Sequence, residues 1–124
     1  MTISRRLNRI SEETPWVKLC GVRDVESAVA LAGLKPDAIG LNLYPPSTRY
    51  VSPEVAAEIC EALPEPVLRV GVFVNSTLVE ILRLVSTVGL EAVQLHGDEP
   101  AELVGQLRAA LPEVLFRPDC LSFR

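Results

Sequence analysis

The chain has 124 residues, of which 48% are hydrophobic and 23% are charged, and its formal net charge is −4 at pH 7. This length fits one domain or part of one, and the acidic balance gives no electrostatic basis for nucleic-acid binding. No apolar run approaches the roughly 20 residues of a membrane span, and the three cysteines show neither metal-like spacing nor a disulfide framework. We therefore expect a cytoplasmic protein.

After a polar segment at residues 1–14, expected to be an N-terminal extension, short apolar strands alternate with amphipathic helices. One helix start is well marked, because Ser52 supplies a hydroxyl N-cap and Pro53 suits the first helical position. Residues 117–124 form a tail that the pattern leaves unassigned, so the expected domain is residues 15–116. The expected strands are residues 16–20, 37–44, 67–74, 91–95 and 114–116. The expected helices are residues 24–32, 77–87, 99–110 and one that begins at 52–54.

The alternation of apolar strands and helices predicts an α/β fold with a parallel sheet, which both an open doubly wound sheet and a (β/α)8 barrel contain. Alternate side chains of a strand share one face, and here one face is polar near the carboxyl end of each strand while the other is aliphatic. A barrel has such an inner face. We therefore expect a partial TIM (β/α)8 barrel of about four βα units plus the start of a fifth strand. The polar pairs are Lys18 and Cys20, Asn42 and Tyr44, and Gln94 and His96.

Cys20 is the first candidate for chemistry, because it ends the first strand just before a glycine turn. Parallel α/β folds place their active sites at the carboxyl ends of the strands, so this thiol is a candidate base or nucleophile. The alternative is that Cys20 is a small core residue, as free cysteines commonly are. Lys18 on the same face either favours the thiolate or forms a structural ion pair lower in the barrel.

Five runs of sequence together resemble the phosphoribosylanthranilate isomerase family, whose members are (β/α)8-barrel enzymes of tryptophan biosynthesis. The resemblance runs in order from about residue 16 to about residue 116. The runs are residues 17–21 (VKLCG), 37–41 (DAIGL), 44–52 (YPPSTRYVS), 70–75 (VGVFVN) and 93–99 (VQLHGDE).

The resemblance implies an Amadori rearrangement of a phosphorylated aminoaldose to an aminoketose, with no metal or organic cofactor. A general acid protonates the ribose ring oxygen, the ring opens to a Schiff base, and a general base removes a proton from C2. By resemblance Cys20 is that base and Arg49 holds the anthranilate carboxylate, which its planar guanidinium fits. Gln94 and His96 line the pocket for this small-molecule phosphosugar substrate.

Several of these residues also have structural interpretations. Arg49 is otherwise a solvated loop arginine, and His96 is otherwise a structural histidine. Asn75 either caps the helix that follows it or touches substrate. Asp98 and Glu99 are expected in the first turn of a helix, where the macrodipole favours acids. The two remaining cysteines are Cys60, expected to pack within a helix, and Cys120, which is in the unassigned tail.

A complete barrel takes roughly 200 to 250 residues. By resemblance, the general-acid aspartate follows a sixth strand and the phosphate loops follow a seventh and an eighth, so Asp119 comes too early to be the acid. We therefore expect a truncated isomerase that is inactive alone and that pairs with a second copy or with a complementary barrel fragment. The alternatives are a non-enzymatic half-barrel that serves binding or assembly, and a different phosphosugar barrel isomerase or epimerase.

Overall fold

The computed structural model describes residues 17–111 and 115–116. The expected extension at residues 1–14 and the tail at 117–124, with Asp119 and Cys120, lie outside these residues. The strands are β1 (Lys18–Cys20), β2 (Ala38–Asn42), β3 (Leu68–Phe73), β4 (Ala92–Leu95) and β5 (Leu115–Phe116). The helices are α2 (Val25–Ala32), α3 (Pro53–Ala62), α4 (Leu78–Leu84), the π-helical turn η1 (Val85–Gly89) and α5 (Ala101–Ala110).

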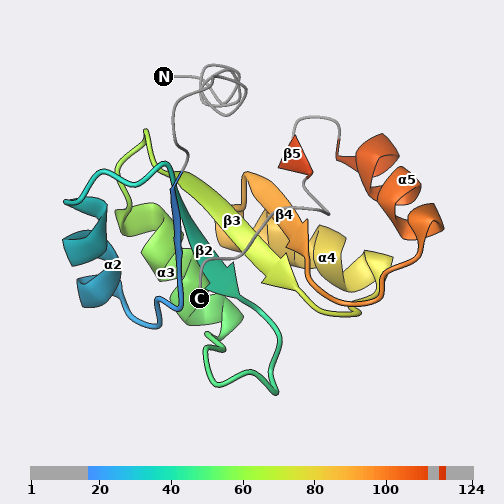
Figure 1. The fold of residues 1–124 in the computed structure, drawn as a ribbon, viewed down its shortest axis with the longest axis horizontal. Coiled ribbons are helices and arrows are strands. Elements are labelled where there is room, and N and C mark those ends of the chain that lie inside the picture. Colours follow the sequence, from blue (N-terminus) through green and yellow to red (C-terminus); the bar gives the residue numbers. More distant parts are fainter. Residues whose placement is uncertain (1–16, 112–114, 117–124) are drawn as a thin grey trace.

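The five strands form one parallel sheet in the order β1-β2-β3-β4-β5, with β1 at an edge (Figure 1). Each strand pairs with the next strand along the chain, and the strand order never reverses as it does at the switch point of a doubly wound sheet. The α/β class and the parallel sheet predicted from the sequence are therefore confirmed. Closure of this sheet into a barrel with further strands stays a prediction.

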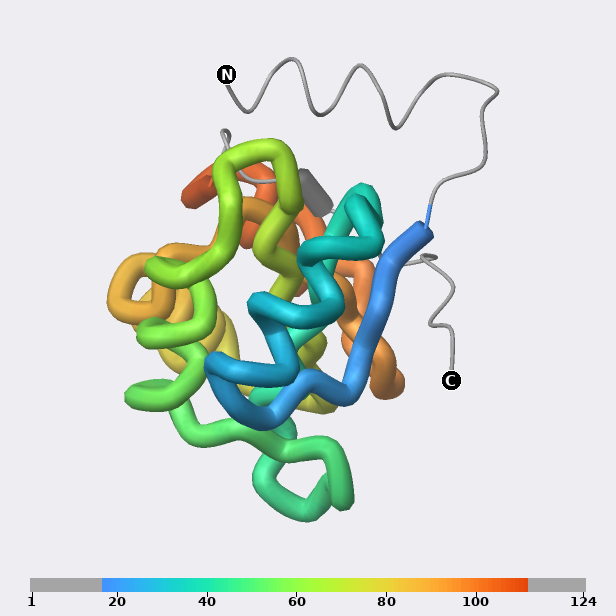
Figure 2. The backbone as a smooth tube through the Cα atoms, turned by 90° about the vertical axis from the view of Figure 1, so that its left-hand side faces the viewer, coloured from blue at the N-terminus to red at the C-terminus, as the bar shows by residue number. Residues whose placement is uncertain are grey.

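The two faces of the sheet differ in what covers them. The main core joins one face, including Ile39, Leu41 and Val93, to buried side chains of the helices. Successive helices pack side by side against this face, and the curved path of the backbone is visible from the side in Figure 2. The opposite face holds a smaller cluster with no helical member: Ala38, Leu68, Val70 and Ala92. The polar strand residues Lys18, Cys20, Asn42 and Gln94 share this second face, since each is level with a member of that cluster or lies two positions further along its strand.

Side-chain caps fix where the helices begin. Ser52 caps α3 as predicted, since its hydroxyl accepts a hydrogen bond from the Val55 amide with Pro53 in the first turn. The cap of α4 is Thr77, so the helix-capping role considered for Asn75 is wrong. The expected helix at 77–87 changes to a π-helical turn after Leu84, which carries the helical backbone on to Gly89.

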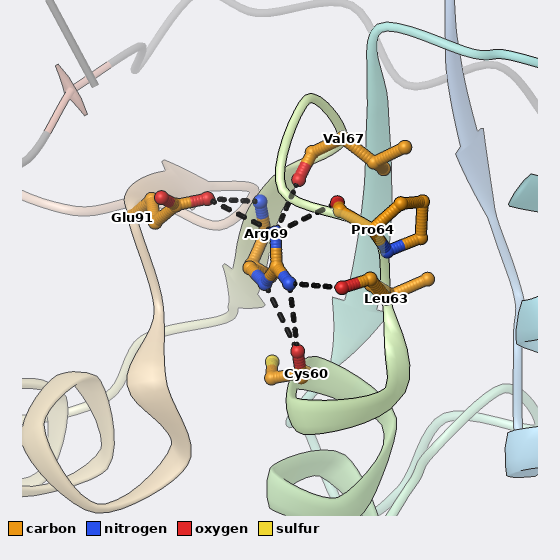
Figure 3. Close-up of polar contacts among 6 residues, drawn as sticks. All are labelled: Cys60, Leu63, Pro64, Val67, Arg69 and Glu91. Atoms are coloured by element: carbon orange, nitrogen blue, oxygen red, sulfur yellow. Dashed lines mark hydrogen bonds and ion pairs between the residues drawn. The ribbon is translucent and has the colours of Figure 1, made fainter. Parts of the chain in front are cut away.

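Arg69 joins the amino end of β3 to the preceding helix, on the helix-covered face of the sheet (Figure 3). Its guanidinium makes five hydrogen bonds of 2.6 to 3.2 Å to four backbone carbonyl groups in and after α3, and it lies 3.7 Å from a carboxylate oxygen of Glu91. The fixed fork of an arginine can satisfy several carbonyls at once. Orphan carbonyls at the end of a helix need such donors. The carbonyl groups belong to Cys60, Leu63, Pro64 and Val67.

Candidate active site

A cavity of about 490 Å³ opens at the carboxyl ends of β1 to β4, on the face that carries the polar side chains. Four successive strands and the loops that follow them contribute to its lining. This is the edge at which parallel α/β proteins bind ligands. The residues that line it are Cys20 and Gly21 after β1, Gly40, Asn42, Tyr44 and Ser47 to Arg49 from β2 and its loop, Val72 and Val74 from β3, and His96 after β4.

Cys20 lies half-buried in this cavity, opposite Gly40 in the register of β1 with β2. The absence of a side chain at Gly40 makes room for the thiol, because a Cβ there would lie 2.6 Å from the Cys20 sulfur and 3.6 Å from Cδ of Lys18. The thiol and the lysine stem therefore lie together over the backbone of β2. The chain turns sharply after Cys20, since Gly21 has a φ of +89°, a conformation that glycine adopts readily.

Lys18 is fully buried, and its ammonium group donates a hydrogen bond to Oε1 of Gln94. Lys18 is level with Ala38, whereas Gln94 is level with Asn42 through the register of the intervening strands. The lysine side chain thus passes the level of Cys20 on its way to the glutamine. Gln94 is fully buried and is not among the lining residues, although it is level with Asn42 and Val72, which line the cavity.

Arg49 reaches the cavity from a loop that folds back onto the end of β2. The Val51 amide donates to the Asn42 carbonyl, and the Arg49 amide donates to the Ser47 hydroxyl at 3.1 Å. The aliphatic part of the Arg49 side chain then lies over Gly21, where a Cβ would be 3.6 Å from Cδ of Arg49. This guanidinium is therefore next to the turn that follows Cys20.

His96 completes the lining from the fourth strand. Its backbone amide donates to the Phe73 carbonyl at 2.8 Å, which extends the pairing of β3 with β4 by one residue. Three of the predicted site residues, Cys20, Arg49 and His96, are thus brought to one cavity from positions far apart in the sequence. Asn75 is not part of the lining, and Glu99 lies before α5 rather than in its first turn, which corrects that expectation.

Several lining residues have no functional role assigned from the sequence, and two polar ones lie at the end of β2. Asn42 and Tyr44 line the cavity, and the strand alternation had already placed both side chains on the face of Cys20. Asn42 has a local structural role as well, because its side-chain oxygen accepts a hydrogen bond from the Tyr44 amide at 2.9 Å. Val72 and Val74 add an apolar wall suited to an aromatic ring.

The lining carries a positive charge at Arg49, and none of the described lining residues is a carboxylic acid. Over the part of the chain that the structure describes, no group of three or more histidine, cysteine or acidic side chains gathers as a metal site would. Among those same residues, no helix is long and apolar enough to cross a membrane.

A parallel βα-repeat sheet with a thiol, a guanidinium and an imidazole around one cavity at its carboxyl edge defines the class: an α/β protein with a candidate small-molecule site. Residues 17–116 match the family model of N-(5'-phosphoribosyl)anthranilate (PRA) isomerase. The chain belongs to the PRA isomerase family.

Individual relatives agree with this assignment. The PRA isomerase of Rubrobacter xylanophilus is 51% identical over 92 residues, which are 74% of this chain and 45% of that protein. The crystal structure of the Thermotoga maritima enzyme has a TM-score of 0.72 at 45% identity and covers 83% of this chain and 49% of the other. A PRA isomerase solved with reduced 1-(o-carboxyphenylamino)-1-deoxyribulose 5-phosphate has a TM-score of 0.74 at 44% identity, over 83% of this chain and 52% of that one. The chain spans about half the length of the relatives it matches.

Proposed function

We propose that this chain supplies the general base and the carboxylate-binding wall of a PRA isomerase site in tryptophan biosynthesis, acting in the cytoplasm. The observation that carries the proposal is the convergence of Cys20, Arg49 and His96 on one cavity at the carboxyl edge of the sheet. A relative in this family was solved with a reduced form of the carboxyphenylamino-deoxyribulose phosphate, which supports a small phosphosugar ligand for this site. We take residues 15–116 as the barrel-forming domain.

In the proposed reaction, Cys20 acts as a thiolate base. After the ribose ring has opened to a protonated Schiff base, the thiolate takes the proton from C2 of the sugar. The electrons of that C–H bond form a double bond between C1 and C2, while the π electrons of the C=N⁺ group move to nitrogen. The product is an enolamine, which becomes the aminoketose when its enol proton moves to carbon, and no bond forms between sulfur and substrate. The Lys18 side chain passes beside the thiol and is held there by its hydrogen bond to Gln94.

Arg49 is proposed to orient the substrate through its anthranilate carboxylate. Its guanidinium lies beside the turn at Gly21, so a carboxylate bound there keeps the sugar end of the substrate close to Cys20. The aromatic ring then packs between the apolar wall of Val72 and Val74 and the side chain of Tyr44. His96 faces the same ligand just after β4, and Gln94 acts through its hydrogen bond with Lys18 rather than by direct contact.

A general acid must stand opposite the base, and the described lining residues provide no carboxylic acid for this role. We therefore propose that the acid and the phosphate clamp come from further polypeptide that pairs with this sheet, either a complementary barrel fragment or a second copy of the chain. By itself the chain is then expected to bind the anthranilate end of the substrate without turning it over. A half-barrel that serves only binding or assembly would give the same result in the absence of a partner.

The proposal is tested by following the loss of PRA fluorescence with the purified chain, alone and mixed with a polypeptide that supplies the remaining strands of a family relative. We expect no turnover alone and turnover in the mixture, abolished by Cys20→Ala and reduced through KM by Arg49→Ala. Glu102→Ala, an exposed substitution in α5, is the control. Turnover by the chain alone would contradict the need for added polypeptide. A mixture whose turnover survives Cys20→Ala would contradict the role of the thiol.

A further inference from the structure

The carboxylate of Glu99 joins two loops at the rim of the cavity. Its Oε2 atom accepts a hydrogen bond from the Asn75 amide at 2.7 Å, and its Oε1 atom accepts one from the Gly97 amide at 2.9 Å. Asn75 follows β3 and Gly97 follows β4, so one side chain holds the ends of two neighbouring strands. We call Asn75, Gly97 and Glu99 the rim clamp.

The residue types of the rim clamp suit this arrangement. Asn75 has a φ of +50°, a left-handed conformation that asparagine tolerates better than most residues. Its side-chain oxygen accepts a hydrogen bond from the Asp98 amide at 3.0 Å. Gly97 allows the two loops to approach, because a Cβ there would lie 2.8 Å from that same oxygen. The rim clamp is therefore built from both loops. Glu99 accepts the two hydrogen bonds, Asn75 forms the left-handed turn, and Gly97 leaves room for the two loops to approach.

The rim clamp is adjacent in sequence to the wall of the cavity. Val74 and His96 line the cavity, and each immediately precedes a clamped residue, Asn75 and Gly97 respectively. Hydrogen bonds to an ionised carboxylate are stronger than those between neutral groups, so the clamp restrains the backbone just beyond each lining side chain.

We propose that Glu99 is a positioning residue, which fixes the imidazole of His96 against the bound substrate by clamping the backbone that follows it. This inference rests on the proposed function, because it assigns His96 to the ligand-binding wall of that site. Glu99 does not touch the substrate itself. Its loss is expected to weaken ligand binding through the loosened position of His96.

The test uses the full chain, in which His96 is the only histidine, so its ring proton signals are unique in an NMR spectrum. In Glu99→Ala we expect the Asn75 and Gly97 amides to exchange with solvent about tenfold faster, the ring signals to shift and broaden, and the affinity for anthranilate to fall about fivefold. Glu99→Gln keeps one acceptor oxygen, so only one of the two amides should lose protection. Glu102→Ala is the matched control and should change none of these quantities.

The result of each of these measurements either supports or contradicts the positioning role of Glu99. Faster amide exchange in Glu99→Ala with unchanged ring signals of His96 would reduce Glu99 to a loop anchor and overturn its positioning role. Asn75→Gly keeps the left-handed backbone while removing the bond to Asp98, and should shift the same ring signals by a smaller amount; it decides the question if Glu99→Ala does not fold. A wild-type chain that fails to bind anthranilate would count against the proposed function, and the ring signals of His96 would then decide the inference alone.

Discussion

Gly40 and Cys20 are matched across the first two strands: a Cβ at Gly40 would come 2.6 Å from the sulfur of Cys20. This distance is shorter than any normal contact between such atoms, and the backbone of a central strand cannot readily move away. The place of the thiol in the cavity therefore depends on a residue of another strand, 20 positions along the chain in the register of β1 with β2.

Substituting Gly40 by alanine is expected to displace the thiol. Overpacking of this kind costs about 1 to 3 kcal/mol of unfolding free energy, which urea denaturation measures. Because the thiol is displaced, the rate at which iodoacetamide alkylates Cys20 should also change. Gly105→Ala is the control, because nothing lies within 4 Å of the added methyl group on helix α5. The free energy of unfolding of Gly105→Ala should rise by up to about 1 kcal/mol, because alanine favours the helix more than glycine does. Equal urea midpoints for the two variants would refute the steric account.

The two described cysteines should react very differently with iodoacetamide. Burial raises the pKa of Cys60 to about 11, and its residue is only 5% exposed, whereas Cys20 lines the cavity. Since the thiolate is the reactive form, peptide mapping after reaction at pH 8 should find Cys20 modified first. Modification of Cys60 should become fast only in urea. Comparable modification of both sites in the native chain would contradict this prediction.

The raised pKa of Cys60 also predicts a loss of stability in base. The thiol ionises near pH 8.5 in an unfolded chain but only near 11 in the folded one, so unfolding releases a proton between these values. Stability is then full below about pH 8.5 and declines as the pH rises toward 11. Urea midpoints measured from pH 8 to 10.5 should fall less steeply in Cys60→Ala than in the wild type. Parallel pH profiles would show that Cys60 does not titrate in this way.

Arg69 is expected to be a major contributor to stability. Arg69→Ala removes the guanidinium that donates to three partly buried carbonyl groups, those of Cys60, Leu63 and Val67, which should cost about 3 kcal/mol of unfolding free energy in urea denaturation. Lysine supplies a charge but not a planar fork, so Arg69→Lys should recover only part of this loss. Arg83→Ala, on an exposed position of α4, should change stability by less than about 0.5 kcal/mol. An Arg69→Ala variant with unchanged stability would contradict the role of Arg69 in joining β3 to α3.

Asp24 is expected to make the stability of the fold depend on acid pH. Its side chain caps α2, and the hydrogen bond from the Ser27 amide, at 2.7 Å, lowers the pKa of the carboxyl group, with the Ser27 hydroxyl adding to the effect. A lowered pKa in the folded state stabilises the fold above the ordinary value near 3.9, and this stabilisation is lost as the pH falls below it. Asp24→Asn keeps the cap without the charge. The urea midpoint of the wild type should therefore drop more than that of Asp24→Asn between pH 6 and pH 3, and an equal drop would contradict the assignment.

Glu99 at the rim of the cavity has a role that the sequence does not predict. Glu99 was expected in the first turn of a helix because acids favour that position, a rule that considers one helix at a time. In the fold its carboxylate instead binds the amides of Asn75 and Gly97, which belong to two loops. No local pattern indicates which backbone amides from distant segments will lack partners, so this role emerged only from the tertiary structure.

The sequence by itself determined the parallel α/β fold and the face on which Cys20, Asn42 and His96 lie, because a strand has a strict period of two and buries its apolar side. It also marked the loop of Arg49 through its resemblance to a known family. Only the tertiary structure decided which side chains on that face are open to the cavity and which are buried. Gln94 shares the alternation of His96 and is level with the lining residue Asn42, yet it is fully buried, because the Lys18 side chain passes Cys20 to meet it. Periodicity fixes the side of a sheet, whereas the level of each side chain depends on the register between strands and on which neighbour fills the space.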